Sequence, residues 1–154
     1  MPRAGPHLDR LVAVFERLRA PGGCPWDRER SLGDLGKHLL EECEEAVTEI
    51  RRLTRRRGDP EALREELGDL LCNLVFTVQI ARERGWFGME EVARGAVDKI
   101  VRRHPHVFGG AKAGTAEEVE ALWANIKARE RAGRRRGAAR ASGRSARSRR
   151  SRRS

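Results

Sequence analysis

The most constraining feature of this sequence is residues 67–81, a stretch that is apolar on nearly every side of a helix. Its length favours a helix over a strand, and a helix that is apolar all round has to be buried. Asp69, Asn73 and Gln79 are the few strongly polar side chains within it. The length of 154 residues favours one compact domain.

Amphipathic periodicity predicts the covering elements, and all of them are helices. Ser31 with Asp34 and Thr115 with Glu118 have the spacing of capping boxes, and Pro60 suits a first helical turn. No segment shows the two-residue alternation of a strand. The sequence thus predicts an all-α fold of about five helices, covering residues 8–18, 31–56, 60–84 and 89–103 and a last helix after Thr115.

The charge of the chain is concentrated at its C-terminal end. Eleven of the 33 basic residues, and none of the 23 acidic ones, lie in residues 131–154. Residues 1–130 therefore carry 22 basic and 23 acidic groups and are nearly neutral. Because residues 131–154 also lack apolar periodicity, we predict a folded domain over 1–130 and a disordered Arg-rich tail over 131–154.

Several classes of protein are excluded by what this sequence lacks. It has no run of about 20 apolar residues that would span a bilayer, and no apolar signal core follows its N-terminus. Cys24, Cys43 and Cys72 are isolated, so neither a disulfide framework nor a thiolate zinc site is indicated. We therefore expect a cytoplasmic protein that does not contact the membrane.

Acidic residues recur at helical spacing on the second and third predicted helices. Glu42 and Glu45 share one helix face, and Glu66 and Asp69 share another, with Asn73 one turn further on. Gathered carboxylates repel each other unless a cation neutralises them, and oxygen-only ligands suit Mg²⁺ or Mn²⁺. The alternatives are a solvated acidic face, which is the usual fate of such a run, and a buried salt bridge to an arginine.

Two further groups of residues are candidates for substrate binding. Lys99, Arg102 and Arg103 lie at the end of the fourth predicted helix, where cations are favoured by the helix dipole but could also capture phosphate. Trp26 and Trp123 are the aromatics available to stack on a base, although core packing is the commoner role of a tryptophan.

These residues lie in motifs that resemble the MazG nucleoside triphosphate pyrophosphohydrolases. The resemblance covers about residues 8–130 and rests on four segments in order. They are Gly-Cys-Pro-Trp-Asp-Arg at 23–28, Leu-Leu-Glu-Glu-Cys-Glu-Glu at 39–45, Glu-Glu-Leu-Gly-Asp-Leu-Leu at 65–71 and Asp-Lys-Ile-Val-Arg-Arg-His-Pro-His-Val-Phe-Gly at 98–109.

The resemblance implies a role for each candidate residue. Glu42, Glu45, Glu66 and Asp69 would bind Mg²⁺, for which Mn²⁺ is a substitute, and Glu41 would orient or deprotonate the attacking water. The catalytic residues that the resemblance implies are Glu41, Glu42 and Glu45. The implied substrate contacts are Lys99, Arg102 and Arg103 for the triphosphate and Trp123, Trp26 and Asn73 around the nucleotide.

The implied reaction is hydrolysis of a nucleoside triphosphate between its α and β phosphates, which gives the monophosphate and pyrophosphate. The resemblance also implies a homodimer whose helices complete a four-helix core. Two alternatives stay open at this point. One is a more selective pyrophosphatase, for dUTP, dCTP or phosphoribosyl-ATP, and the other is a non-enzymatic helical module held to nucleic acid by nonspecific contacts of the basic tail.

Overall fold

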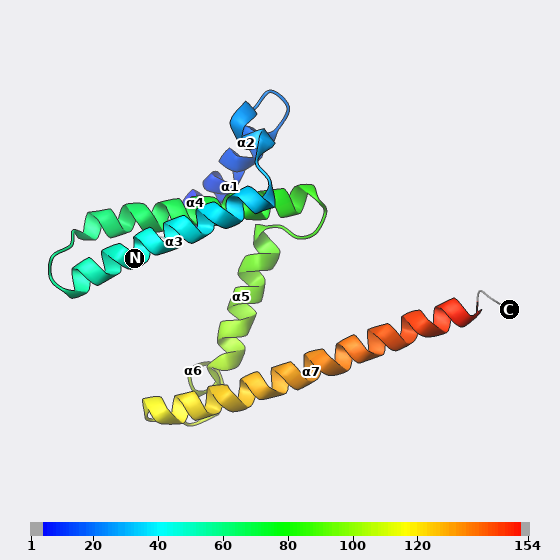
Figure 1. The fold of residues 1–154 in the computed structure, drawn as a ribbon. Helices are drawn as coiled ribbons and strands as arrows, with labels where there is room; N and C mark the ends of the chain where they lie inside the picture. Colours follow the sequence, from blue (N-terminus) through cyan, green and yellow to red (C-terminus); the bar gives the residue numbers. More distant parts are fainter. Residues whose placement is uncertain (1–4, 152–154) are drawn as a thin grey trace. The chain divides into compact units, whose positions relative to one another are not determined.

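The fold is helical in every element of the chain that can be described. A computed structural model describes the backbone of residues 5–151 and the side chains of residues 5–133. Its helices are α1 (Gly5–Arg19), α2 (Pro25–Glu29), α3 (Leu32–Thr54), α4 (Pro60–Glu83), α5 (Met89–Arg103), α6 (Pro105–Phe108) and α7 (Ala116–Ser151) (Figure 1). The predicted all-α class is confirmed. None of these helices is long and apolar enough to cross a membrane.

The number of helices exceeds the prediction by two short ones. The fourth predicted helix ends before Pro105 as expected, but the short helix α6 begins there, and α2 replaces most of the loop predicted at 24–28. Each begins with a proline, whose fixed φ angle and missing N–H suit a first helical position. The prediction was wrong there because periodicity cannot be read from four or five residues.

The ends of the long helices follow from local capping. The Ser31 hydroxyl accepts a hydrogen bond from the Asp34 N–H at 3.3 Å, and the Asp34 carboxylate accepts one from the Ser31 N–H at 2.9 Å. Asp59 caps α4 by accepting from the Glu61 N–H at 3.0 Å. After α4 the chain turns through Gly85, whose φ of 69° is favourable only for glycine.

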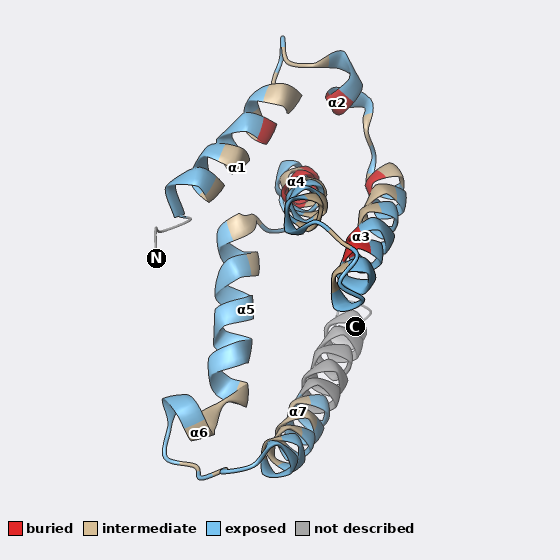
Figure 2. Cartoon of the chain, turned by 90° about the vertical axis from the view of Figure 1, so that its left-hand side faces the viewer, coloured by how far each residue is buried: buried red, intermediate tan, exposed pale blue. Residues whose placement is uncertain are grey.

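The chain divides into two compact units, Met1–Arg94 and Gly95–Ser154. In the first unit α3 and α4 pack along each other as a hairpin, and α1 packs on α4 (Figure 1). The buried residues drawn in Figure 2 lie on α1 to α4. They form a core around stacked Phe15 and Phe76 rings, 5.0 Å apart, with Leu35, Val75 and Ile80.

Helix α4 is buried over only part of its length. Val75, Phe76, Val78, Ile80 and Ala81 are buried, but Leu67, Leu71 and Leu74 are exposed. The expectation of a helix buried all round therefore fails for its N-terminal half within one chain. The reason is geometric: α1 and α3 cover α4 from two sides and leave a third side of leucines in solvent.

Arg19 ties the short helix α2 to the rest of the first unit. Its guanidinium donates to both carboxylate oxygens of Glu83 on α4, each at 2.7 Å. It also donates to the backbone carbonyl of Asp27 at 2.5 Å. This contact fixes the segment that carries Trp26.

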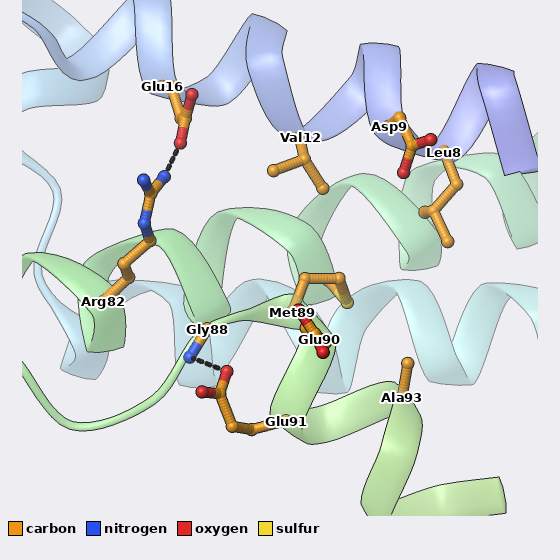
Figure 3. A pocket seen from close by; sticks show the side chains of 10 residues that line it. All are labelled: Leu8, Asp9, Val12, Glu16, Arg82, Gly88, Met89, Glu90, Glu91 and Ala93. Carbon is orange, nitrogen blue, oxygen red and sulfur yellow. Dashed lines mark hydrogen bonds and ion pairs between the residues drawn. The ribbon is translucent and has the colours of Figure 1, made fainter.

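A groove of about 570 Å³ lies where α1, the end of α4 and the start of α5 meet (Figure 3). Leu8, Val12 and Met89 supply its apolar surface, and an ion pair between Arg82 and Glu16 joins two of its sides. The Glu91 carboxylate accepts from the Gly88 N–H at 3.0 Å. These contacts fix the path of the chain from α4 into α5.

The second unit consists of the remainder of α5 with α6 and α7. The apolar face predicted for the last helix, Val119, Leu122, Trp123 and Ile126, is half-buried as expected. No side chain described in residues 95–133 is fully buried.

The backbone of α7 extends to Ser151, and the disordered tail predicted for residues 131–154 stays a prediction. Side chains beyond residue 133 lie outside the described residues, as does the predicted contact of the tail with nucleic acid.

The core predicts where truncation is costly. Leu35 is fully buried between helices, with an exposed fraction of 0%. Leu35→Ala should lower the free energy of unfolding by about 2–5 kcal/mol, because the cavity adds to the lost burial. Urea titration followed by circular dichroism measures this. Val14→Ala is the control, since Val14 is 44% exposed, and an equal loss in both variants would contradict the assigned core.

Candidate functional site

The α3–α4 hairpin brings acidic side chains of both helices together. Glu42 and Glu45 lie one turn apart on α3, and Glu66 faces them from α4. Each offers a carboxylate oxygen, and the three oxygens all lie within 4.8 Å of one another. We call Glu42, Glu45 and Glu66 the acidic cluster. Glu42 and Glu66 are half-buried, and Glu45 is exposed.

No cation of the described protein neutralises the acidic cluster. Among the side chains of residues 5–133, no ion pair with lysine or arginine involves Glu42, Glu45, Glu66 or Asp69. The one hydrogen bond to Glu42 comes from the Asn73 amide, whose Nδ2 donates to Oε1 at 3.3 Å. The salt-bridge alternative raised by the sequence therefore finds no support in this part of the chain.

The pKa values of two carboxyl groups in the acidic cluster are raised. Burial, followed by the negative charges of Asp69 and Glu45, raises the pKa of Glu42. Burial and the charges of Glu45, Asp69 and Glu42 likewise raise the pKa of Glu66. Burial also raises the pKa of the nearby Cys72 thiol, which favours its protonated, unreactive form.

The acidic cluster fits a hard divalent cation. Two oxygens bound to one Mg²⁺ lie about 3–4 Å apart, given Mg–O distances of about 2.1 Å. The spacing of the acidic cluster needs only small side-chain movements to reach this geometry. The donors are all oxygen, which favours Mg²⁺ or Mn²⁺ over zinc.

The remaining acids of the predicted site lie around this group. Asp69 is exposed on α4 and lies outside the three residues whose oxygens converge, although its charge acts on Glu42. Glu41 is exposed, and its Oε2 lies 3.2 Å from His38 Nδ1. Neither the sequence pattern nor the resemblance had singled out His38.

A second acid missed by the sequence analysis is Glu49. It is buried and forms an ion pair with Arg52, one turn further along α3. Glu49 could have been identified from the sequence, because it lies four residues after Glu45 and so continues the same helix face. Glu49 and Arg52 line a groove of about 480 Å³ together with Glu45 and Glu66.

Trp26 and Asn73 line a pocket of about 350 Å³ beside the acidic cluster. Glu42 contributes to its wall, as do His38 and Phe76. Trp26 is exposed rather than part of the core, and the Arg30 guanidinium lies 4.6 Å from its ring centroid. A planar, partly apolar ligand would find an aromatic surface and an amide here.

The predicted cationic residues lie in the second unit. Lys99 is exposed on α5, whereas Arg102 and Arg103 both bind the carboxylate of Glu130 on α7. Trp123 is half-buried and packs edge-on against His104, with ring centroids 5.1 Å apart. The structure thus joins Arg102 and Arg103 through Glu130, while the recorded contact of Trp123 is with His104.

Comparison with known proteins assigns this arrangement to a family. The model of the MazG nucleotide pyrophosphohydrolase domain matches residues 30–108, which include the acidic cluster and the cationic end of α5. The chain belongs to the MazG family. The resemblance stated from the sequence motifs is confirmed.

Individual MazG relatives cover most of this chain. It is 41% identical over 131 residues to the nucleoside triphosphate pyrophosphohydrolase/pyrophosphatase MazG of Thermotoga maritima. This alignment covers 85% of this chain and 48% of that protein. The chain is 43% identical over 126 residues to a nucleoside triphosphate pyrophosphohydrolase of Escherichia coli K12, spanning 81% and 46%. The chain therefore spans about half the length of these curated relatives.

A solved structure has the same MazG fold. The crystal structure of a MazG-related protein from Thermotoga maritima matches with a TM-score of 0.62 and 29% identity. The match covers 77% of this chain and 97% of that one. The helical arrangement found here is therefore that of the family.

The repulsion within the acidic cluster predicts a pH dependence of stability in metal-free buffer. The folded-state pKa of Glu66 lies above its ordinary value of 4.5, so the folded protein holds more protons than the unfolded one above that pH. Its contribution to stability is then present below this value and lost as pH rises through the folded pKa. With EDTA present, the wild type should lose more unfolding free energy than Glu66→Gln between about pH 5 and about pH 7. Equal losses, measured by urea titration, would contradict the assigned repulsion.

Proposed function

We propose that this chain hydrolyses nucleoside triphosphates between the α and β phosphates in a Mg²⁺-dependent reaction, releasing the monophosphate and pyrophosphate. The observation that carries the proposal is the acidic cluster, whose three carboxylates converge with no lysine or arginine paired to them among the side chains of residues 5–133. The names of the MazG relatives from Thermotoga maritima and Escherichia coli support the reaction class.

In this proposal Glu42, Glu45 and Glu66 hold the metal, and Asp69 joins them from the next turn of α4. When bound, Mg²⁺ would offset the charge on the phosphate oxygens and make an adjacent water molecule more acidic. Asn73 donates to Glu42 Oε1 and so fixes the orientation of one ligand. Its role resembles that of the outer hydrogen-bond partners found at many metal sites.

Glu41 is the proposed acceptor of the proton from the attacking water. Its Oε2 is engaged by His38 Nδ1 at 3.2 Å, which leaves Oε1 for the water. Since Glu41 is exposed on the same helix as the proposed ligands, water can reach it. This arrangement suits a general base that is oriented by a neighbouring ring.

Each of the two units offers its own candidate contacts for the substrate. Lys99, Arg102 and Arg103 supply positive charge for the triphosphate, and arginine offers a planar fork that matches phosphate oxygens. Trp26 and Asn73 line the pocket beside Glu42 and would receive the nucleotide. Trp123 is the third proposed nucleotide contact.

We also propose that the chain acts as a homodimer. Six large apolar side chains on the hairpin are exposed in a single chain, and burying an apolar patch of this kind is the usual driving force for association. They lie on two adjacent helices, which suits a core of four helices made from two hairpins. The residues are Leu40, Val47 and Ile50 on α3 and Leu67, Leu71 and Leu74 on α4.

The metal assignment is tested by removing one proposed ligand. Glu42→Gln should lower Mg²⁺-dependent release of pyrophosphate by at least about 100-fold, since even the outer partners of metal ligands contribute about 10–100-fold. Asp69→Asn should also abolish metal-dependent turnover while the helical content stays unchanged. A panel of nucleoside triphosphates, assayed with and without Mg²⁺, gives the reference rates and tests the more selective alternatives.

Glu65→Gln is the matched control for this experiment, because Glu65 is an exposed acid on α4 beside Glu66 but lies outside the acidic cluster. It should retain wild-type turnover. Retained activity in both Glu42→Gln and Asp69→Asn would overturn the ligand assignment.

The dimer is tested by placing a charge on the exposed leucine face. Leu71→Lys should shift the sedimentation coefficient from that of a dimer to that of a monomer, because a lysine at the centre of an apolar interface is left without a partner. Val14→Lys, at an exposed valine of α1, should leave the dimer intact. A monomeric wild type would exclude the proposal.

A further inference from the structure

We propose that Glu130 is a positioning residue, which holds the guanidinium groups of Arg102 and Arg103 in the orientation that receives phosphate. This inference rests on the proposed function, since it concerns the arginines assigned there to the triphosphate. It adds to the phosphate-binding residues a carboxylate that the sequence motifs had not marked.

The contact is made by one carboxylate and two arginines. Oε1 of Glu130 accepts from Arg102 Nε at 2.9 Å and lies 2.8 Å from Arg102 Nη2. Oε2 accepts from Arg103 Nη2 at 2.7 Å. Each oxygen is therefore committed to a different arginine, and the two neighbouring side chains of α5 are drawn toward one point on α7.

The carboxylate is well suited to be a permanent counter-charge. The Glu130 side chain is only 12% exposed, so water competes little for its oxygens. Hydrogen bonds from Arg103 and Arg102 lower its pKa to about 2, which keeps it ionised wherever a nucleotide carries its full charge. Two guanidinium groups against one carboxylate leave one net positive charge for a ligand.

The two arginines keep N–H donors that Glu130 does not use. A guanidinium has five N–H donors, and Glu130 takes only one edge of Arg102 and one nitrogen of Arg103. Arg102 remains 55% exposed. Arg103 Nε is buried and has no hydrogen-bond partner in the described part of the chain. Because that nitrogen is buried, the donors open to a phosphate oxygen are those of the exposed Arg102 that Glu130 leaves free.

Holding the arginines beforehand favours binding, because each immobilised long side chain otherwise costs rotamer entropy on association. Two other roles for Glu130 are a clamp between α5 and α7 and a competitor of phosphate for the arginines. These roles predict different outcomes. If Glu130 is only a clamp, its removal changes the stability of the protein and leaves phosphate binding unchanged. If Glu130 competes with phosphate, its removal tightens phosphate binding.

The test compares Glu130→Gln, Glu130→Asp and wild type in the full chain by calorimetric titration with inorganic pyrophosphate and Mg²⁺. Glu130→Gln should bind pyrophosphate about tenfold more weakly, at the low end of what groups that orient binding side chains contribute. Glu130→Asp keeps the negative charge, so its affinity for pyrophosphate should lie between those of the wild type and Glu130→Gln. The midpoint of its thermal unfolding should be unchanged. For turnover, KM should rise more than kcat falls.

Glu120→Gln is the matched control, because Glu120 is an exposed acid of the same helix. It should bind pyrophosphate as the wild type does. If Glu130→Gln does not fold, weaker binding by Glu130→Asp at an unchanged midpoint supports the inference by itself.

Equal or tighter binding in folded Glu130→Gln, or no binding by the wild type, would overturn the inference. A wild type that binds pyrophosphate but hydrolyses no triphosphate would overturn the proposed function instead. The two failures are thus distinguishable.

Discussion

The structure depends on a repulsion between carboxylates that no lysine or arginine side chain described in residues 5–133 relieves. Three carboxylates on facing turns of α3 and α4 lie within 4.8 Å of one another, and no lysine or arginine described in residues 5–133 pairs with them. A hairpin that brings such groups together must obtain its stability elsewhere. The aromatic and aliphatic core around Phe15, Leu35 and Phe76 provides it, on the part of α4 that follows the acids. Helix α4 thus carries its acidic residues in one part of its length and its buried core residues in a later part.

Features set by local chemistry could be predicted from the sequence. The start of α3 at its Ser31–Asp34 capping box and the start of α4 at Pro60 depend on neighbouring residues only. The convergence of Glu42, Glu45 and Glu66 was also predictable, because each helix presents residues three apart on one face and a short connection places the helices side by side. Asp69 is the exception: helical spacing placed it with Glu66, but it stays exposed outside the converging group.

Features set by long-range contacts could not be predicted in the same way. Nothing in the sequence pairs Arg102 and Arg103 with Glu130, which lies 27 residues after Arg103 and is one of several acids on its helix. The extent to which α4 is covered also depends on where α1 and α3 pack, and this left Leu67, Leu71 and Leu74 exposed.

The two units differ in how they are stabilised, and this bears on the proposed assembly. The first has an interior of its own, whereas no side chain described in residues 95–133 is fully buried. Val97, Ile100 and Phe108 of the second unit are exposed, so its apolar residues gain little within a single chain. A helical segment with so little interior becomes rigid only through ion pairs, such as those of Glu130, or through further surface from a second copy. Ion pairs such as those of Glu130 would then determine how firmly the cations proposed for the triphosphate are held. Metal binding and phosphate binding would thereby depend on different interactions, the first on the carboxylates of the hairpin and the second on ion pairs within the second unit.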